Sequence, residues 1–153
     1  MKRVLYCSTI LPVLIIFVLI IFFSVSPALA QVQTRVRVIQ ASNTGSTIAN
    51  PLRDLHGQIG SLFNFSSYQL LKDETVTLSP NRPVEISTHP GATLQIELTK
   101  TPKKDVAEVR VKVKREGSEI LNTLLKLSPG KTVSIGGPKH GDGTIILAIT
   151  ARF

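Results

Sequence analysis

From Leu71 to the C-terminus, apolar residues alternate with polar ones at a spacing of two, and turn residues interrupt the alternation at short intervals. A period of two places successive side chains on opposite faces of an extended chain, so it indicates β-strands. Closely spaced strands with Pro- and Gly-containing turns between them are typical of antiparallel hairpins in a sandwich or small barrel. We therefore expect a mainly β fold with strands over these ranges: 75–78, 84–87, 93–98, 106–114, 120–127, 132–135 and 144–153.

The last of these segments differs from the others because it is apolar on both faces. Ile145, Leu147 and Ile149 share one face, and Ile146 and Ala148 share the other. A strand of this kind is covered on both sides. We expect it to lie in the middle of its sheet.

The segment before Leu71 predicts a strand, one short helix and a return strand. Residues 34–38 alternate strictly, with two valines on one face and Arg35 and Arg37 on the other. Asn50 followed by Pro51 is typical of a helix N-cap and first helical position. Residues 65–71 then form the return strand. The apolar stripe of the helix consists of Leu52, Leu55, Ile59, Leu62 and Phe63.

The first 30 residues have the layout of a secretory signal. Two basic residues precede an apolar run over 10–23, and a small-x-small triplet from Ala28 to Ala30 follows it. This order predicts cleavage after the triplet, so that the mature chain begins at Gln31. The apolar run is also long enough to span a bilayer, and an uncleaved anchor is the alternative. In either case we expect 31–153 to be delivered outward and to fold as a single periplasmic or secreted domain.

Composition limits the partners of the mature segment. It keeps 16 of the 18 basic residues against 10 acidic ones, a net charge of +6, which favours anionic partners. Because we expect the domain to be exported, we expect no nucleic acid among them. The mature segment has no cysteine and its three histidines are far apart in sequence, so we expect neither a metal site nor a cofactor.

Basic residues gather around one predicted strand. Arg110, Lys112 and Lys114 alternate with three valines, so they share a face. Arg115 extends this charge at one end of the strand, and Lys103 and Lys104 lie in the turn before it. These six residues are the candidate anion-binding site. The alternative is a solvated face whose charges discourage aggregation at a sheet edge.

Candidate catalytic residues are few. His140 and Asp142 lie close together in a loop and could both reach one ion or substrate, although Gly-Asp-Gly is also ordinary hairpin-turn chemistry. Ser128 and Lys131 match the letters of a Ser-x-x-Lys motif, but Pro-Gly between them makes a turn where that motif needs a helix. We therefore expect the protein not to be an enzyme, with a hydrolase using the loop pair as the alternative.

One stretch, from Asn122 to Gly137, resembles the core of bacterial outer-membrane secretins. Its letters are NTLLKLSPGKTVSIGG. In that family a strand, a Gly-containing turn, a Thr-Val-x-Ile strand and a Gly-Gly pair form a hairpin of the channel wall. The resemblance implies a bacterial envelope context and a hairpin at this position.

Together these features predict an exported, non-enzymatic protein of the bacterial cell envelope. It would act through contacts with an envelope protein or an anionic surface. The first alternative is a binding module for an anionic glycan or a lipid head group, which would use the basic strand face.

Overall fold

The computed structural model describes residues 31–89 and 91–153, with the backbone alone at 89 and 101–103. The predicted signal and its cleavage residues Ala28 and Ala30 lie outside this part of the chain. Within it no helix is long and apolar enough to cross a membrane. The elements are β1 (Val32–Ser42), η1 (Asn50–Leu52), α2 (Arg53–Phe63), β2 (Ser67–Leu78), β3 (Val84–His89), β4 (Ala92–Lys103), β5 (Val106–Arg115), β6 (Ser118–Leu127), β7 (Thr132–His140) and β8 (Gly143–Arg152).

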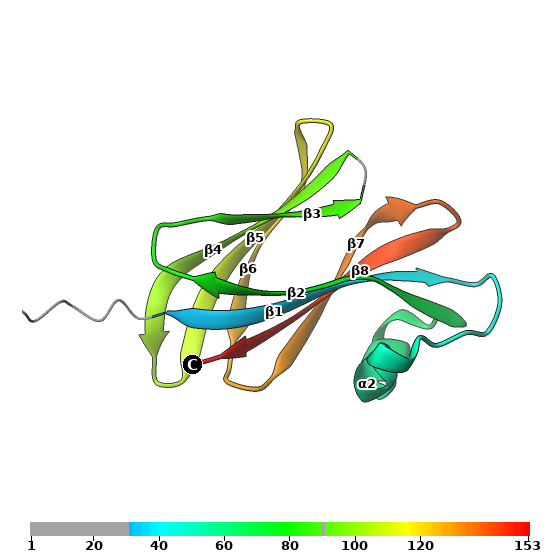
Figure 1. Ribbon diagram of the computed structural model, residues 1–153, viewed down its shortest axis with the longest axis horizontal. Coiled ribbons are helices and arrows are strands. Elements are labelled where there is room, and N and C mark those ends of the chain that lie inside the picture. The colour runs from blue at the N-terminus through cyan, green and yellow to red at the C-terminus, as the bar shows by residue number, and fades with distance from the viewer. Residues whose placement is uncertain (1–30, 90) are drawn as a thin grey trace, which may run out of the picture.

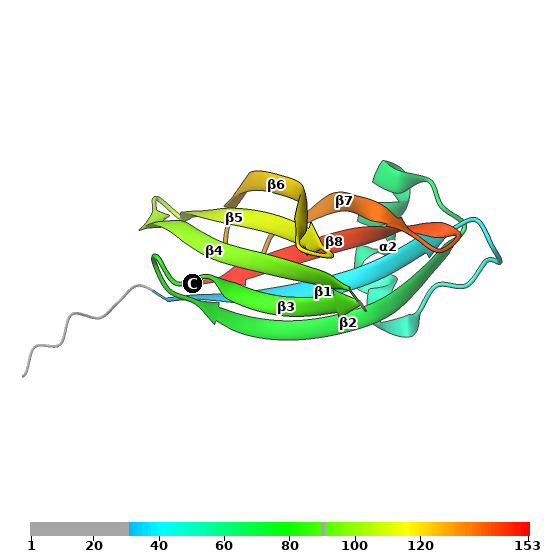
Figure 2. The ribbon, with the colours of Figure 1, turned by 90° about the horizontal axis from the view of Figure 1, so that it is seen from above.

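The strands form two four-stranded sheets stacked as a β-sandwich, which confirms the predicted fold class (Figures 1 and 2). The first, called sheet 1, has the order β2-β1-β8-β7, and the second, sheet 2, has the order β3-β4-β5-β6. Neighbouring strands are antiparallel throughout. Sheet 2 is a continuous meander, whereas sheet 1 brings the first and last parts of the described chain together.

The main core lies between the two sheets. It consists of the inward-facing residues of both, among them Val36 of β1, Val111 of β5 and Leu147 of β8, each at most 1% exposed. The predicted alternation of β5 is confirmed, because its three valines are buried while its basic residues face outward. The period-two pattern thus gave the correct face of each of these strands.

A second core lies on the outer face of sheet 1, where α2 covers one half of that face. Leu52, Leu55 and Ile59 pack there against Ile39 of β1 and Ile146 of β8, among other residues. Strand β8 is therefore buried on both faces and lies inside its sheet, as predicted. The other half of this outer face is not covered by the helix, and it carries polar side chains.

Two details of the predicted helix are wrong. Asn50 lies inside the 3₁₀ turn, whose N-cap is Ala49, and no side chain caps it. Leu62 is 60% exposed although it belongs to the predicted apolar stripe. Phe63, the next residue, packs against the second core and is partly buried, so Leu62 is the stripe residue that the core does not cover.

Two predicted boundaries also differ from the structure. The strands expected at 65–71 and 75–78 form the single strand β2, because β1 continues beside both and pairs with them through one register shift. The strand expected at 132–135 continues to His140, through Gly136, Gly137 and Pro138. They lie within β7 at a bulge, where pairing with β8 shifts register between Gly136 and Lys139.

The segment that resembles a secretin hairpin is not a hairpin here. Strand β6 pairs with β5 in sheet 2, and β7 pairs with β8 in sheet 1. The turn at Ser128–Lys131 therefore carries the chain from one sheet to the other. It is closed by a hydrogen bond of 3.1 Å from the Lys131 N–H to the Ser128 carbonyl.

Candidate functional site

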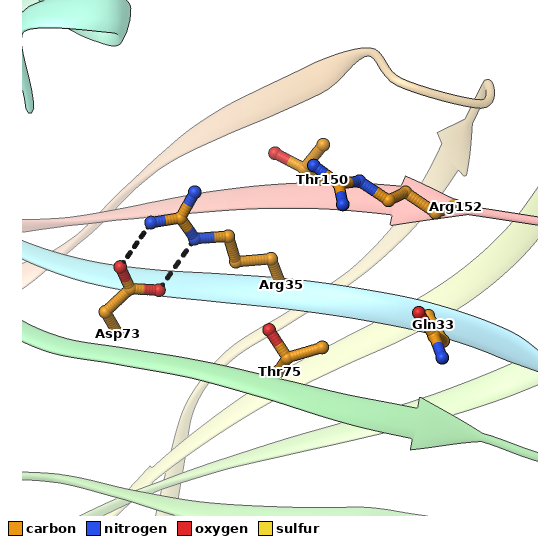
Figure 3. A pocket seen from close by; sticks show the side chains of 6 residues that line it. All are labelled: Gln33, Arg35, Asp73, Thr75, Thr150 and Arg152. Carbon is orange, nitrogen blue, oxygen red and sulfur yellow. Dashed lines mark hydrogen bonds and ion pairs between the residues drawn. The ribbon is translucent and has the colours of Figure 1, made fainter.

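A hollow of about 370 Å³ lies on the open half of the outer face of sheet 1 (Figure 3). Strands β1, β2 and β8 each contribute two side chains, because these strands are neighbours and every second residue faces outward. All the lining residues are polar: Gln33, Arg35, Asp73, Thr75, Thr150 and Arg152. The hollow is therefore suited to a polar ligand.

Arg35 and Asp73 form a bidentate ion pair on one side of the hollow. Arg35 Nε donates to Asp73 Oδ1 at 2.8 Å, and Nη2 donates to Oδ2 at 2.5 Å. This hydrogen bonding lowers the pKa of Asp73 and raises the pKa of Arg35, and both effects exceed the opposing effect of burial. The pair is thus ionised at physiological pH, and its orientation is fixed by planar guanidinium–carboxylate geometry.

Arg152 supplies the unneutralised charge of the site. It is exposed, and within the described part of the chain it makes no ion pair and no side-chain hydrogen bond. It lies opposite Gln33 in the β1–β8 ladder, and Thr150 lies opposite Arg35. In Figure 3 the side chains of Arg152 and Thr150 both extend from β8 on the side of the sheet that carries the Arg35–Asp73 pair. The hollow therefore carries two guanidinium groups and one carboxylate.

The helix-covered half of the face begins at Arg37, two positions along β1 from Arg35. The side chain of Arg37 is only 4% exposed, and its Nη1 donates to both carboxylate oxygens of Asp54 in α2, at 3.0 and 2.9 Å. Gln58 of α2 also donates to the Thr132 carbonyl of β7 at 2.9 Å. These contacts hold the helix against the sheet and leave the hollow beside it open.

The structure places the predicted basic residues of β5 on the outer face of sheet 2, away from the hollow. Arg110 faces Glu97 of β4 across the ladder, and Lys114 faces Glu119 of β6. Lys112 Nζ lies 3.6 Å from Glu119 Oε2. Acidic neighbours are thus interleaved with the basic row, and this face has mixed charge.

The remaining members of the predicted basic group are not brought together. Lys103 and Lys104 lie where β4 turns into β5, and Arg115 ends β5 at the other end of the sheet. At about 3.3 Å per residue, roughly 30 Å of strand separates the two ends. In addition, β5 lies inside sheet 2, so its charges cannot protect a sheet edge.

His140 is the last residue of β7, and Asp142 lies in the exposed turn that joins β7 to β8. Gln40 donates to the His140 carbonyl at 3.4 Å. His56 lies on α2, with its ring centroid 6.0 Å from that of Tyr68. Among the described residues, no three His, Cys, Asp or Glu side chains gather into a group that could hold a metal ion.

Sequence reasoning missed the hollow. Its residues come from positions 33–35, 73–75 and 150–152, and only the pairing of β1 with both β2 and β8 brings them together. Alternation does identify Arg35 as outward-facing, but it does not say which strand lies beside it. The local sequence offers little signal, because only 150–152 alternates polar with apolar residues, whereas 33–35 and 73–75 are polar throughout.

No family model matches this chain, and neither a curated protein nor a solved structure matches it.

Proposed function

We propose that this protein is an exported, non-enzymatic domain of the bacterial cell envelope that binds an acidic glycan in the hollow on sheet 1. The observation that carries the proposal is the exposed guanidinium group of Arg152, which has no partner in the described chain and lies beside an ordered Arg35–Asp73 pair. The net charge of the mature segment and the predicted signal support the exported, anion-binding part of the proposal.

A carboxylate is the anion that this site fits best. The guanidinium group of Arg152 offers parallel N–H donors in a planar fork, the geometry that a carboxylate accepts. Arg35 is already paired with Asp73, so the pair adds little net charge and forms a fixed polar wall. A ligand carboxylate would therefore pair with Arg152 first.

The neutral side chains of the hollow favour a sugar. Gln33, Thr75 and Thr150 offer an amide and two hydroxyl groups, which can both donate to and accept from sugar hydroxyls. The volume lies within the range of small-molecule sites, roughly 300–1,000 Å³. The lining offers no apolar side chain to insert among lipid tails, so a membrane surface fits this site less well.

Binding is tested with the purified protein on immobilised polygalacturonate, a carboxylated glycan. Arg152→Glu should weaken binding at least tenfold, since it reverses the one unpaired charge of the hollow. Lys139→Glu makes the same charge change at an exposed position of β7, beside the end of β8 that lies away from Arg152. This control should leave affinity within twofold. Equal losses in both variants would mean that net charge drives binding, and the hollow would be rejected.

The basic face of sheet 2 is the second candidate, and Arg110→Glu distinguishes the two. If Arg110→Glu abolishes binding while Arg152→Glu does not, the site lies on β5. Vesicles of phosphatidylglycerol, compared with phosphatidylcholine, provide a further arm. Retention on the anionic vesicles alone would transfer the proposal to a lipid head group.

Export and protein partners are tested together in cells. The tagged, natively expressed protein is crosslinked and captured, and its partners are identified by mass spectrometry. The N-terminus of the captured protein is read in the same sample and should be Gln31. An intact N-terminus would replace the exported soluble domain with an anchored one. A reproducible link to one envelope protein, without glycan binding, would favour the protein-contact role over the glycan role.

A hydrolase that uses His140 and Asp142 is the alternative from another class. In an activity screen on glycan and ester substrates, the double variant His140→Ala/Asp142→Ala is the relevant comparison. A hydrolytic activity that is present in the wild type and absent from this variant would overturn the non-enzymatic proposal.

A further inference from the structure

The sandwich has four edge strands, and three of them carry features that oppose pairing with another chain. Strand β3 has only six residues and a register shift near its end. Strand β7 contains Pro138, which lacks a backbone N–H, within a bulge. Strand β2 has three consecutive charged residues, from Lys72 to Glu74. Short length, bulges, proline and charge are the usual means by which sheet edges avoid association.

Strand β6 differs from these three. It spans ten residues, contains no proline, and carries no charged residue between Glu119 and Lys126. Its side chains include two of the large apolar residues exposed on this protein, Ile120 at 43% and Leu124 at 48%. In the described chain β6 pairs with β5 alone, so its second edge is open. A long apolar edge of this kind favours pairing with a further strand.

We propose that this edge is an interface between two copies of the protein, in which β6 pairs with β6 of the second copy in antiparallel orientation. The two copies of sheet 2 would then form one continuous sheet. A two-fold axis through the middle of β6 generates this arrangement, and such an interface is self-complementary. It would place the two Leu124 side chains on the same outer face, a few positions apart, where they cover each other.

Charge along β6 argues for a second copy as the occupant. Glu119 lies near the start of the strand and Lys126 near its end, and both face outward with the basic row of β5. In an antiparallel pair, Glu119 of each copy lies near Lys126 of the other. In a parallel pair, like charges would face each other, at a cost of several tenths of a kcal/mol for each contact. The strand therefore complements itself in one orientation only.

The oligomeric state of the full-length expressed protein, measured by analytical ultracentrifugation over a wide concentration range, tests the interface. The wild type should sediment as a dimer. Leu124→Lys should raise the dimer dissociation constant at least tenfold, because it places two ammonium groups near the axis. The matched control is Leu62→Lys on α2, which changes another exposed leucine (60%) and should leave the dimer intact.

Charge exchange tests the orientation of the strands. Glu119→Lys and Lys126→Glu should each weaken the dimer about three- to tenfold, and the double variant should restore it. Because Glu119 also contacts Lys112, the unfolding midpoint of each variant is measured to show that the monomer remains folded. A wild type that is monomeric throughout, a Leu124→Lys protein that dimerises as well as the wild type, or single charge variants with unchanged affinity would overturn the proposal.

Discussion

Arg37 of β1 and Asp73 of β2 occupy directly opposite positions in the ladder, yet each forms its ion pair with another residue. Arg37 binds Asp54 of the helix, and Asp73 binds Arg35, which lies two positions earlier in β1. This arrangement divides the outer face of sheet 1. One arginine anchors α2, and the other forms a wall of the hollow.

Loss of the Asp54 carboxylate should destabilise the fold. Asp54→Ala leaves the buried guanidinium group of Arg37 with one long contact, to the Pro51 carbonyl at 3.4 Å. Removing the partner of a buried polar group costs about 1–3 kcal/mol of the free energy of unfolding. Urea denaturation measures the change, and Arg53→Ala, at the exposed neighbouring position, is the control. Equal effects of the two substitutions would contradict this role of the pair.

The Arg35–Asp73 pair should make stability depend on pH in the acidic range. The pKa of Asp73 is lowered in the folded protein by its hydrogen bonds to Arg35, whereas an unfolded aspartate titrates near 3.9. The contribution of the pair is therefore complete above about pH 5 and is lost as the pH falls through the lowered pKa. For a partly exposed pair we expect about 0.5–1 kcal/mol.

Asp73→Asn tests this pH dependence. The variant should lower the urea midpoint at pH 7 and should approach the wild type as the pH falls through the lowered pKa of Asp73, where the wild-type carboxyl becomes protonated. A constant difference between the two proteins from pH 7 to pH 2 would show that the carboxylate charge is not responsible.

Ile59 and Leu62 lie one turn apart on α2 and should respond very differently to truncation. Ile59 is fully buried in the second core, whereas Leu62 is 60% exposed. Ile59→Ala should cost about 2–4 kcal/mol of the free energy of unfolding, through lost burial and the cavity that remains. Leu62→Ala should stay within about 0.5 kcal/mol. A large effect at Leu62 in the monomer would mean that the helix packs differently.

Two glycines should respond in opposite directions to alanine. A Cβ on Gly143 would lie 2.2 Å from the Ala41 carbonyl oxygen, so Gly143→Ala should push β8 away from β1 and lower stability strongly. A Cβ on Gly57 of α2 would meet no atom within 4 Å, so Gly57→Ala should raise stability by about 1 kcal/mol through helix propensity. Thermal unfolding of both variants measures the signs.

Sequence patterns predicted the faces of strands better than their ends or their neighbours. Burial of alternate residues decides the face, so the valines of β5 and both faces of β8 were predicted correctly. The ends of a strand depend on its partner: β2 continues through its charged segment because β1 lies beside it, and β7 continues through Gly136 and Gly137 at a bulge. The sequence of a strand does not indicate which strand will lie beside it.

The candidate site shows the same limit. The sequence identified the basic row of β5 because its residues are close in the chain, but it did not reveal the acidic neighbours supplied by β4 and β6. Arg35, Asp73 and Arg152 are far apart in the chain, and the ladder alone brings them together. Charge content is local information, whereas the neutralisation of a charge is a property of the tertiary structure.

The pairing of β1 with β8 has a consequence for the order of folding. The first strand of the domain needs the last one as its inner neighbour, and more than 100 residues separate Gln33 from its partner Arg152. Contacts between such distant segments form slowly, since a long loop must close first. A chain that leaves the cytoplasm N-terminus first would therefore expose the apolar inner face of β1 until its final ten residues emerge. For the exported chain that we propose, delayed closure would keep the chain unfolded during passage through a narrow channel, and a holding chaperone on the far side would be an advantage.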